Sequence, residues 1–243
     1  LCGFLQEFPS IRLEINDAEP TDLHTIQSWA NLKDMGYKIV IGSKRKSQID
    51  EIQKTITSNI LTPLRILGDH GIGKTRLVLE ALKGSEFRSA VLYAETPSAL
   101  PRGFLRSLSS KDNFEKCILV VDECALCKHH DIWNYISNVS ERVSLVTIFN
   151  EEENYEQKIA RIAIEPLESN EVAKIISSHN IPEDKAHELA ELCSGSPRVA
   201  HMIGEQIELT GHINIACRKD LWERYIAGTD SIGSECYLKR LRV

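Results

Sequence analysis

The stretch that decides the fold lies between two apolar segments and reads Gly68-Asp69-His70-Gly71-Ile72-Gly73-Lys74-Thr75. The run 64–67 before it predicts a buried strand, and the leucine-rich segment 76–82 after it predicts a helix. Glycines let consecutive backbone N–H groups curl around phosphate oxygens, and the following helix offers its positive N-terminal end. The spacing GxxxxGK[ST] in this context predicts a phosphate-binding P-loop, the alternative being a glycine-rich turn that binds no nucleotide.

The residues of this loop have distinct expected roles in holding a nucleotide. Lys74 is expected to reach the β- and γ-phosphates, and Thr75 to place its hydroxyl on a magnesium ion. The positions from Gly68 to Gly73 surround the phosphates, and Arg76 opens the helix and is included among the nucleotide-binding residues. The predicted cofactors are therefore ATP or ADP with Mg²⁺.

Composition limits the class of protein. With 243 residues, of which 42% are apolar, the chain can bury a sizeable core. A net charge of −6 argues against a general affinity for nucleic-acid backbone, although an acidic protein can carry a local basic patch. Seven scattered cysteines suggest reduced thiols and a cytoplasmic location. No apolar window is long enough to span a bilayer, so no membrane is expected, and the start at Leu1 suggests a fragment of a longer protein.

Five apolar runs predict the strands of one sheet, at residues 64–67, 90–94, 118–122, 143–149 and 161–164. Helical segments separate them, and isoleucines at helical spacing predict a further helix over 48–60, before the P-loop. Strands this apolar indicate a parallel sheet covered on both faces, with ligands beyond the carboxyl ends of its strands. The expected fold class is α/β, a three-layer αβα P-loop sheet followed by a small helical lid.

The pattern also predicts how the chain is divided. Residues 1–40 are interpreted as a linker or the tail of an upstream domain, with a short helix around Trp29. Residues 41–167 are expected to form the nucleotide-binding domain. Beyond Pro166 the apolar period becomes helical, which predicts a helical lid over 168–228 and the start of a following segment over 229–243.

A second motif, which is acidic, lies 48 residues after the P-loop. It consists of Asp122 and Glu123, which follow the apolar run 117–121. This is a Walker B motif, in which a buried strand delivers Asp122 to the magnesium shell. Glu123 is expected to orient and deprotonate the water that attacks the γ-phosphate. Asn150 follows the next strand and is expected to hold the same water. The alternatives are a strand end capped with acids and, for Asn150, an ordinary turn residue.

In this order the motifs resemble the AAA+ and STAND branch of P-loop ATPases, where a polar sensor residue follows an Asp-Glu Walker B. The stretch 41–49 is similar to the GR box of STAND proteins, which implies that Gly42 lies near the adenine, although Ser43 stands where that family has arginine. The stretch 164–171 resembles the junction between sheet and lid. The residues Gly195-Ser196-Pro197-Arg198 resemble the sensor-2 element of the lid.

The resemblance implies further roles for two arginines. Arg198, with Pro197 beside it, would touch the γ-phosphate from the lid, the alternative being a solvated arginine at a helix start. Arg161 matches the position of an arginine finger that AAA+ motors supply to a neighbouring subunit. The tail 234–242 resembles the segment that leads into a winged-helix domain.

One cluster matches no pattern of that family, namely Cys124-Ala125-Leu126-Cys127-Lys128-His129-His130. A CxxC with following histidines has the spacing of metal ligands, but no second CxxC completes a zinc site. The interpretation favoured here is two semi-buried thiols in a loop that leads into a helix around Trp133.

Three functions fit these observations. The first is a slow STAND-type signalling ATPase, whose nucleotide state controls lid angle and homo-oligomerisation after flanking domains recognise a protein or nucleic-acid trigger. The second is a DNA-handling AAA+ motor or loader, favoured by Arg198 and Arg161. The third is a scaffold that binds ATP without hydrolysing it, which the intact Glu123 disfavours. The acidic composition favours the first over the second.

Overall fold

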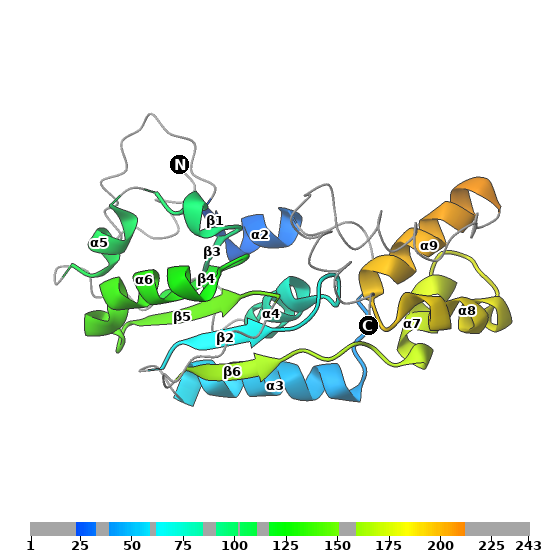
Figure 1. Cartoon of the computed structure of the whole chain (residues 1–243), viewed down its shortest axis with the longest axis horizontal. Helices are drawn as coiled ribbons and strands as arrows, with labels where there is room; N and C mark the ends of the chain where they lie inside the picture. The colour runs from blue at the N-terminus through cyan, green and yellow to red at the C-terminus, as the bar shows by residue number, and fades with distance from the viewer. Residues whose placement is uncertain are drawn as a thin grey trace. The chain divides into compact units, whose positions relative to one another are not determined.

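The computed structural model describes residues 23–32, 39–58, 62–84, 91–101, 103–110, 117–150 and 159–211 (Figure 1). These residues divide between two compact units, which are described separately. The sheet unit takes its residues from Leu1–Met35, Arg45–Gly68 and Lys74–Ala163. The helical unit takes its residues from Gly36–Lys44, Asp69–Gly73 and Ile164–Val243.

The sheet unit is built on a sheet whose described strands lie in the order β1-β3-β4-β5-β2-β6. Their bounds are Leu23–Thr25 (β1), Leu64–Leu67 (β2), Val91–Ala94 (β3), Cys117–Val121 (β4), Val143–Ile148 (β5) and Ala160–Ala163 (β6). From β2 to β6 all pairs are parallel, and each strand agrees with its predicted range to within one residue. The strand ranges could be predicted because strands of a parallel sheet are buried on both faces and therefore appear in the sequence as continuous apolar runs.

The strand order reverses beside β2, the strand that leads into the glycine loop. From β2 the chain passes to β3, returns through β4 and β5, and then adds β6 on the other side of β2 (Figure 1). In open sheets of this kind the ligand site lies beyond the carboxyl ends of the strands at such a reversal. The topology therefore places the glycine loop where a ligand is expected.

The edge strand β1 corrects the interpretation of residues 23–32 as part of a linker. Instead of one short helix, this segment forms β1, antiparallel to β3, followed by helix α2 (Ile26–Leu32). Leu23 and Trp29 are both buried within the sheet unit. The segment is therefore an integral part of the sheet unit, and the sheet is mixed rather than wholly parallel.

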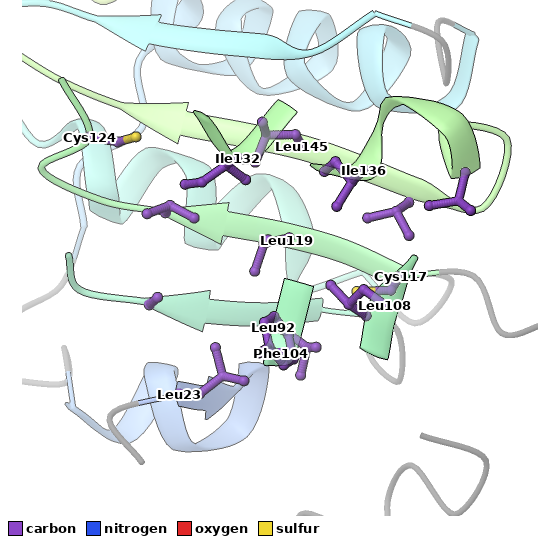
Figure 2. Close-up of a cluster of buried hydrophobic side chains, with 14 residues drawn as sticks. Leu23, Leu92, Phe104, Leu108, Cys117, Leu119, Cys124, Ile132, Ile136 and Leu145 are labelled. Atoms are coloured by element: carbon purple, nitrogen blue, oxygen red, sulfur yellow. The ribbon is translucent and has the colours of Figure 1, made fainter. Parts of the chain in front are cut away.

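Helices cover both faces of the sheet. They are α3 (Ser43–Ser58), which begins five residues earlier than predicted, α4 (Lys74–Leu82), α5 (Phe104–Leu108) and α6 (Leu126–Ile136), with 3-10 turns η1 (Pro97–Ala99) and η2 (Ser137–Val139). Figure 2 shows the core on one face, where Phe104 of α5 and Ile132 of α6 pack with Leu119 of β4. On the other face α2 contacts α4, and Gln53 Nε2 of α3 donates to Ala81 O of α4 at 2.8 Å. The predicted αβα layering is confirmed.

The helical unit contains three of the described helices, as predicted, around its own core. They are α7 (Ser169–Ser177), α8 (Glu183–Ala190) and α9 (Pro197–Thr210), with the 3-10 turn η3 (Glu191–Cys193) between the last two. The core is formed by Leu167, Val172, Ala173, Ile175, Ile176, Ile181, Ala186, Leu189, Ala190, Cys193, Val199, Ala200 and Ile203. The last of the three segments that form this unit begins at Ile164, four residues before the predicted start of the lid at 168. The predicted lid end at 228, the segment 229–243 and the tail 234–242 lie outside the described residues.

Gly195 shows why the junction needs a glycine. Its φ is +76°, and a Cβ there would collide with Pro166 Cβ and lie 2.7 Å from Leu167 O. Its carbonyl accepts a hydrogen bond from Leu167 N at 2.9 Å, which ties the predicted junction to the start of the predicted sensor-2 element. In the described part of the chain no helix is long and apolar enough to cross a membrane.

Candidate nucleotide-binding site

The loop lysine lies at the start of α4 and contacts two oxygens of the sheet unit. Lys74 Nζ donates to Gly68 O at 2.9 Å and to Asn150 Oδ1 at 2.7 Å, and the side chain is buried. Asn150 lies two residues after the end of β5, and it reaches the lysine because β5 and β2 are neighbours with parallel carboxyl ends. Two predicted site residues, 76 positions apart, are thus in direct contact.

The two predicted metal ligands are also in contact. Thr75 Oγ1 donates to Asp122 Oδ2 at 2.5 Å, and Asp122 directly follows β4 and is buried. Its other oxygen, Oδ1, accepts a hydrogen bond from the backbone N–H of Glu123 at 2.9 Å. Hydroxyl and carboxylate oxygens are the ligands that Mg²⁺ prefers, so this pair fits a magnesium ion.

Glu123 occupies a backbone conformation that non-glycine residues rarely adopt. Its φ is +45°, which costs about 1–2 kcal/mol for an L-residue. Hydrogen bonds on either side hold this turn, since Asp122 N donates to Ala94 O at 2.9 Å and Cys124 N donates to Ile148 O at 3.0 Å. The neighbouring strands β3 and β5 therefore fix the backbone position from which the exposed Glu123 side chain extends.

Asn150 connects the lysine with this carboxylate. Its Nδ2 donates to Glu123 Oε2 at 3.3 Å while its Oδ1 accepts from Lys74. The two amide atoms thus face a cation and an anion, as donor and acceptor should. Lys74, Asn150 and Glu123 form one chain of polar contacts at the carboxyl edge of the sheet.

Tyr93 is a residue of the site that sequence analysis missed. Its hydroxyl donates to Asp122 Oδ2 at 3.2 Å, and its ring is wholly buried on β3. Burial, and then the charge of Asp122, raise the pKa of Tyr93 above its usual value, so the phenol stays protonated and keeps donating. The available signal was one hydroxyl in the otherwise apolar strand 91–94.

Arg65 is a second residue that sequence analysis missed, inside β2. The arginine is buried, and its Nη1 donates to Cys124 O at 3.0 Å and to Thr147 Oγ1 at 3.4 Å. His129 Nδ1 bonds the same threonine hydroxyl at 2.8 Å. Burial, followed by the charge of Arg65, lowers the pKa of His129 to about 3. A neutral histidine and an arginine thus support the segment that follows Glu123.

Two other predicted residues lie elsewhere in the sheet unit. Arg161 is half-buried in β6, opposite Arg65 in the strand register, and its charge is among those that lower the pKa of His129. Arg76 Nε forms an ion pair with Glu80 Oε1 along α4 at 2.8 Å. The finger role of Arg161 and the nucleotide contact of Arg76 remain predictions.

Residues 69–73 of the glycine loop belong to the helical unit, with Asp69 exposed, His70 half-buried and Ile72 buried. Gly71 and Gly73 have φ of +75° and +89°, which favours glycine at both positions. Gly71 O accepts hydrogen bonds from Ser196 Oγ at 3.0 Å and from Arg198 N at 3.3 Å. The predicted sensor-2 element and the glycine loop are therefore in contact.

The beginning of α9 is well suited to hold this contact. Pro197 is its first residue, and Ser196 caps the helix by accepting from Val199 N at 3.3 Å. A Cβ on Gly73 would lie 3.5 Å from Pro197 Cγ, and one on Gly71 would lie 3.3 Å from Arg198 Cβ. The exposed side chain of Arg198 therefore starts beside the loop.

The stretch that resembles a GR box packs against the predicted junction. A Cβ on Gly42 would collide with the carboxylate of Glu171, in the first turn of α7. Lys44 pairs with Glu168 at 3.2 Å and with Glu165 at 3.7 Å, and these acids raise its pKa, that of Glu168 most. Gly42 is therefore placed by the start of α7, and its predicted place near the adenine remains a prediction.

The cysteine and histidine cluster does not converge on a metal. Cys124 and His129 are buried, whereas Cys127 is exposed. The two thiols were predicted to be semi-buried in a loop that leads into the helix, but Cys127 lies in the first turn of α6, which also contains both histidines in its first half. Across the described ranges no three side chains of the metal-binding types come together.

Comparison with solved structures identifies the fold, whereas no protein-family model and no curated protein matches the sequence. The Aeropyrum pernix ORC1 protein, solved in complex with DNA, has a TM-score of 0.55 at 16% identity, over 92% of this chain and 72% of that one. Hsp104 of S. cerevisiae, solved with casein, has a TM-score of 0.53 at 12% identity, over 90% and 46%.

A STAND protein with a tetratricopeptide repeat sensor, from Pyrococcus horikoshii, has a TM-score of only 0.44 at 16% identity, over 69% of this chain and 30% of that one. This chain also spans less than half the length of the Hsp104 chain. At these identities the comparisons show the fold alone: the chain has the α/β fold of the Aeropyrum pernix ORC1 and S. cerevisiae Hsp104 structures.

Proposed function

We propose that this chain is an ATP-binding and ATP-hydrolysing switch module of the STAND type. One observation carries the proposal: the four residues that a hydrolytic P-loop site requires meet at one edge of the sheet. Thr75 and Glu123 each donate a hydrogen bond to Asp122, and Asn150 connects Lys74 with Glu123. A phosphate-binding loop alone would serve a kinase or a GTPase equally well. The adjoining strained glutamate favours hydrolysis.

Binding follows from the groups that the loop presents. Lys74 Nζ exchanges its bond to Asn150 Oδ1 for a phosphate oxygen, which is a stronger acceptor for an ammonium than a neutral amide. Thr75 and Asp122 would hold Mg²⁺, and that ion would neutralise charge on the phosphates. Because Thr75 and Asp122 already lie within hydrogen-bond distance, little rearrangement is needed to present both oxygens to one ion.

Hydrolysis follows from the groups that this exchange releases. Asn150, once its Oδ1 is no longer bonded to Lys74, can accept a hydrogen bond from water while its Nδ2 stays near Glu123. Glu123 would then take the proton of that water as the water oxygen bonds to the γ-phosphorus, while the bond from that phosphorus to the β,γ-bridging oxygen breaks and ADP leaves with the electron pair. The backbone bonds on both sides of Glu123 keep the carboxylate in place during this step.

The switch is proposed for the helical unit. Ser196 and Arg198 contact Gly71 of the glycine loop, so a change in that loop on nucleotide binding alters the hydrogen bonds at the start of α9. We propose that Arg198 reads the γ-phosphate and that the lid angle then controls assembly of a homo-oligomer. The protein or nucleic-acid trigger would be recognised by flanking domains.

A DNA-handling motor or loader is the second candidate. The Aeropyrum pernix ORC1 structure contains DNA, and its fold is shared by this chain. Arg198 and Arg161 also suit a motor. The net charge of −6 favours the signalling role instead, because phosphate contacts require basic groups. DNA affinity that weakens steeply with salt would favour the motor, and its absence at low salt would remove that candidate.

Equilibrium binding of Mg·ATP by calorimetry tests the proposed site. Lys74→Ala should abolish ATP and ADP binding, while Lys83→Ala serves as the matched control. Lys83 lies just after α4 and pairs with Glu80, so its loss should leave nucleotide affinity unchanged. Equal binding by wild type and Lys74→Ala would contradict the proposal.

The switch has its own test. Arg198→Ala should keep ADP affinity and weaken the discrimination between ATP and ADP, whereas a selective loss of ADP would contradict the role. Light scattering of the full-length protein with ATP and its trigger should detect an oligomer. A monomer under those conditions would refute the STAND assignment while leaving the nucleotide site intact.

A further inference from the structure

An aromatic stack reaches the metal-binding carboxylate from the N-terminal segment. The rings of Trp29 on α2 and Tyr93 on β3 lie parallel, with centroids 4.1 Å apart and planes at 3°. Both side chains are fully buried. The Tyr93 hydroxyl donates to Asp122 Oδ2, the oxygen that also accepts from Thr75. The segment 23–32 is thereby linked to the proposed magnesium site.

Backbone pairing reinforces this link. In the register between β1 and β3, His24 is opposite Tyr93 and Leu23 is opposite Ala94. Ala94 O in turn accepts from Asp122 N at 2.9 Å, so strand β3 holds both the backbone and the side chain of Asp122. The position of the carboxylate therefore depends on an element that begins far from either nucleotide motif.

In this stack Trp29 acts through its ring rather than through its N–H. The indole Nε1 is buried and has no hydrogen-bond partner in the described part of the chain. A buried donor without a partner is unfavourable, so stacking must compensate for it. A phenylalanine at this position would retain the stack without the unpaired donor.

We propose that Tyr93 is a positioning residue for the carboxylate of Asp122, and that Trp29 holds Tyr93 in place, so that the segment 23–32 sets the Mg²⁺ requirement of nucleotide binding. This inference rests on the proposed function. Three donors converge on the carboxylate, from Thr75, Glu123 and Tyr93, and together they fix its plane. Removing a group that orients a metal ligand in this way typically lowers the metal affinity several-fold or more.

The Mg²⁺ concentration for half-maximal binding of ATPγS to the full chain tests the inference. Tyr93→Phe keeps the stack and removes the donor, so this concentration should rise about three- to tenfold. ADP affinity measured in EDTA should stay unchanged, which a general loss of structure would not allow. Trp29→Phe should behave as wild type, and Trp29→Leu should behave as Tyr93→Phe.

The double variant Trp29→Leu/Tyr93→Phe shows whether Trp29 acts through Tyr93 or whether the two residues affect Mg²⁺ binding independently. If Trp29 acts through the Tyr93 hydroxyl, Trp29→Leu combined with Tyr93→Phe should be no worse than Tyr93→Phe alone. Multiplied losses, or an unaltered Mg²⁺ requirement in Tyr93→Phe, would overturn the inference. If Trp29→Leu fails to fold, Tyr93→Phe and Trp29→Phe still decide it. A wild type that binds no Mg·ATPγS would refute the proposed function first, and the inference with it.

Discussion

Lowering the pH from 7.5 to 5.0 should remove about 2 kcal/mol from the free energy of unfolding through His129 alone. The imidazole is fully buried on α6, with the Arg65 cation close by, and its pKa in the folded chain is lowered to about 3. In the unfolded chain the ordinary pKa of about 6.5 returns. Below pH 6.5 His129 therefore binds a proton in the unfolded state but stays neutral in the folded state.

The size and direction of this effect follow from the two pKa values. Stability is fully present above pH 6.5 and falls by about 1.4 kcal/mol for each pH unit below it, until the folded-state pKa near 3 is reached. The buried contact explains the low value, because Nδ1 bonds Thr147 and Nε2 finds no partner among the described residues. An imidazolium there would carry an unsatisfied charged donor.

Urea unfolding at a series of pH values, in wild type and in His129→Asn, measures this contribution. The stability difference between the two proteins should change by about 2 kcal/mol between pH 7.5 and 5.0. His201, whose pKa is lowered to about 4 by burial and by His179, titrates in both proteins and cancels. His129→Phe is the control. Its stability at pH 7.5 should differ from that of His129→Asn, but its stability difference from wild type should change with pH by the same amount. A difference independent of pH would refute the reasoning.

Two further predictions concern the helical unit. Gly204→Ala would place a methyl group on the ring of His179, so the urea midpoint should fall by the equivalent of about 1–3 kcal/mol, and an unchanged midpoint would show that this packing is wrong. Ser196→Ala removes the cap of α9 and the bond to Gly71 O, which should cost about 1–2 kcal/mol in the same assay, whereas Ser196→Thr should recover most of it.

The positions of residues that belong to a local motif were predictable from the sequence, whereas their chemical roles remain predictions. Lys74, Thr75, Asp122 and Glu123 each follow or begin an element whose apolar pattern is continuous. The spacing of each motif is therefore enough to assign all four residues to one edge of the sheet. The position of Asn150 followed from the same rule, since it lies just beyond the carboxyl end of β5, the strand that pairs with β2.

Residues that act through long-range partners were not predictable. Tyr93 and Arg65 are single polar residues in apolar strands, and their partners lie 29 and 59 positions away in the chain. Strand β1 has only three residues, too few for an alternating pattern, and it is defined by pairing with β3. Such features depend on which strands become neighbours, and no local pattern encodes that choice.

ATP binding and hydrolysis by Glu123→Gln, measured side by side with wild type, test the central claim most directly. The amide keeps the size of the side chain and its contact with Asn150, but it cannot take a proton from water. The account predicts Mg²⁺-dependent hydrolysis by wild type, a fall in kcat of about 10²–10⁴-fold in the variant, and ATP affinity that stays the same. Hydrolysis at the wild-type rate, or loss of ATP binding together with hydrolysis, would contradict it.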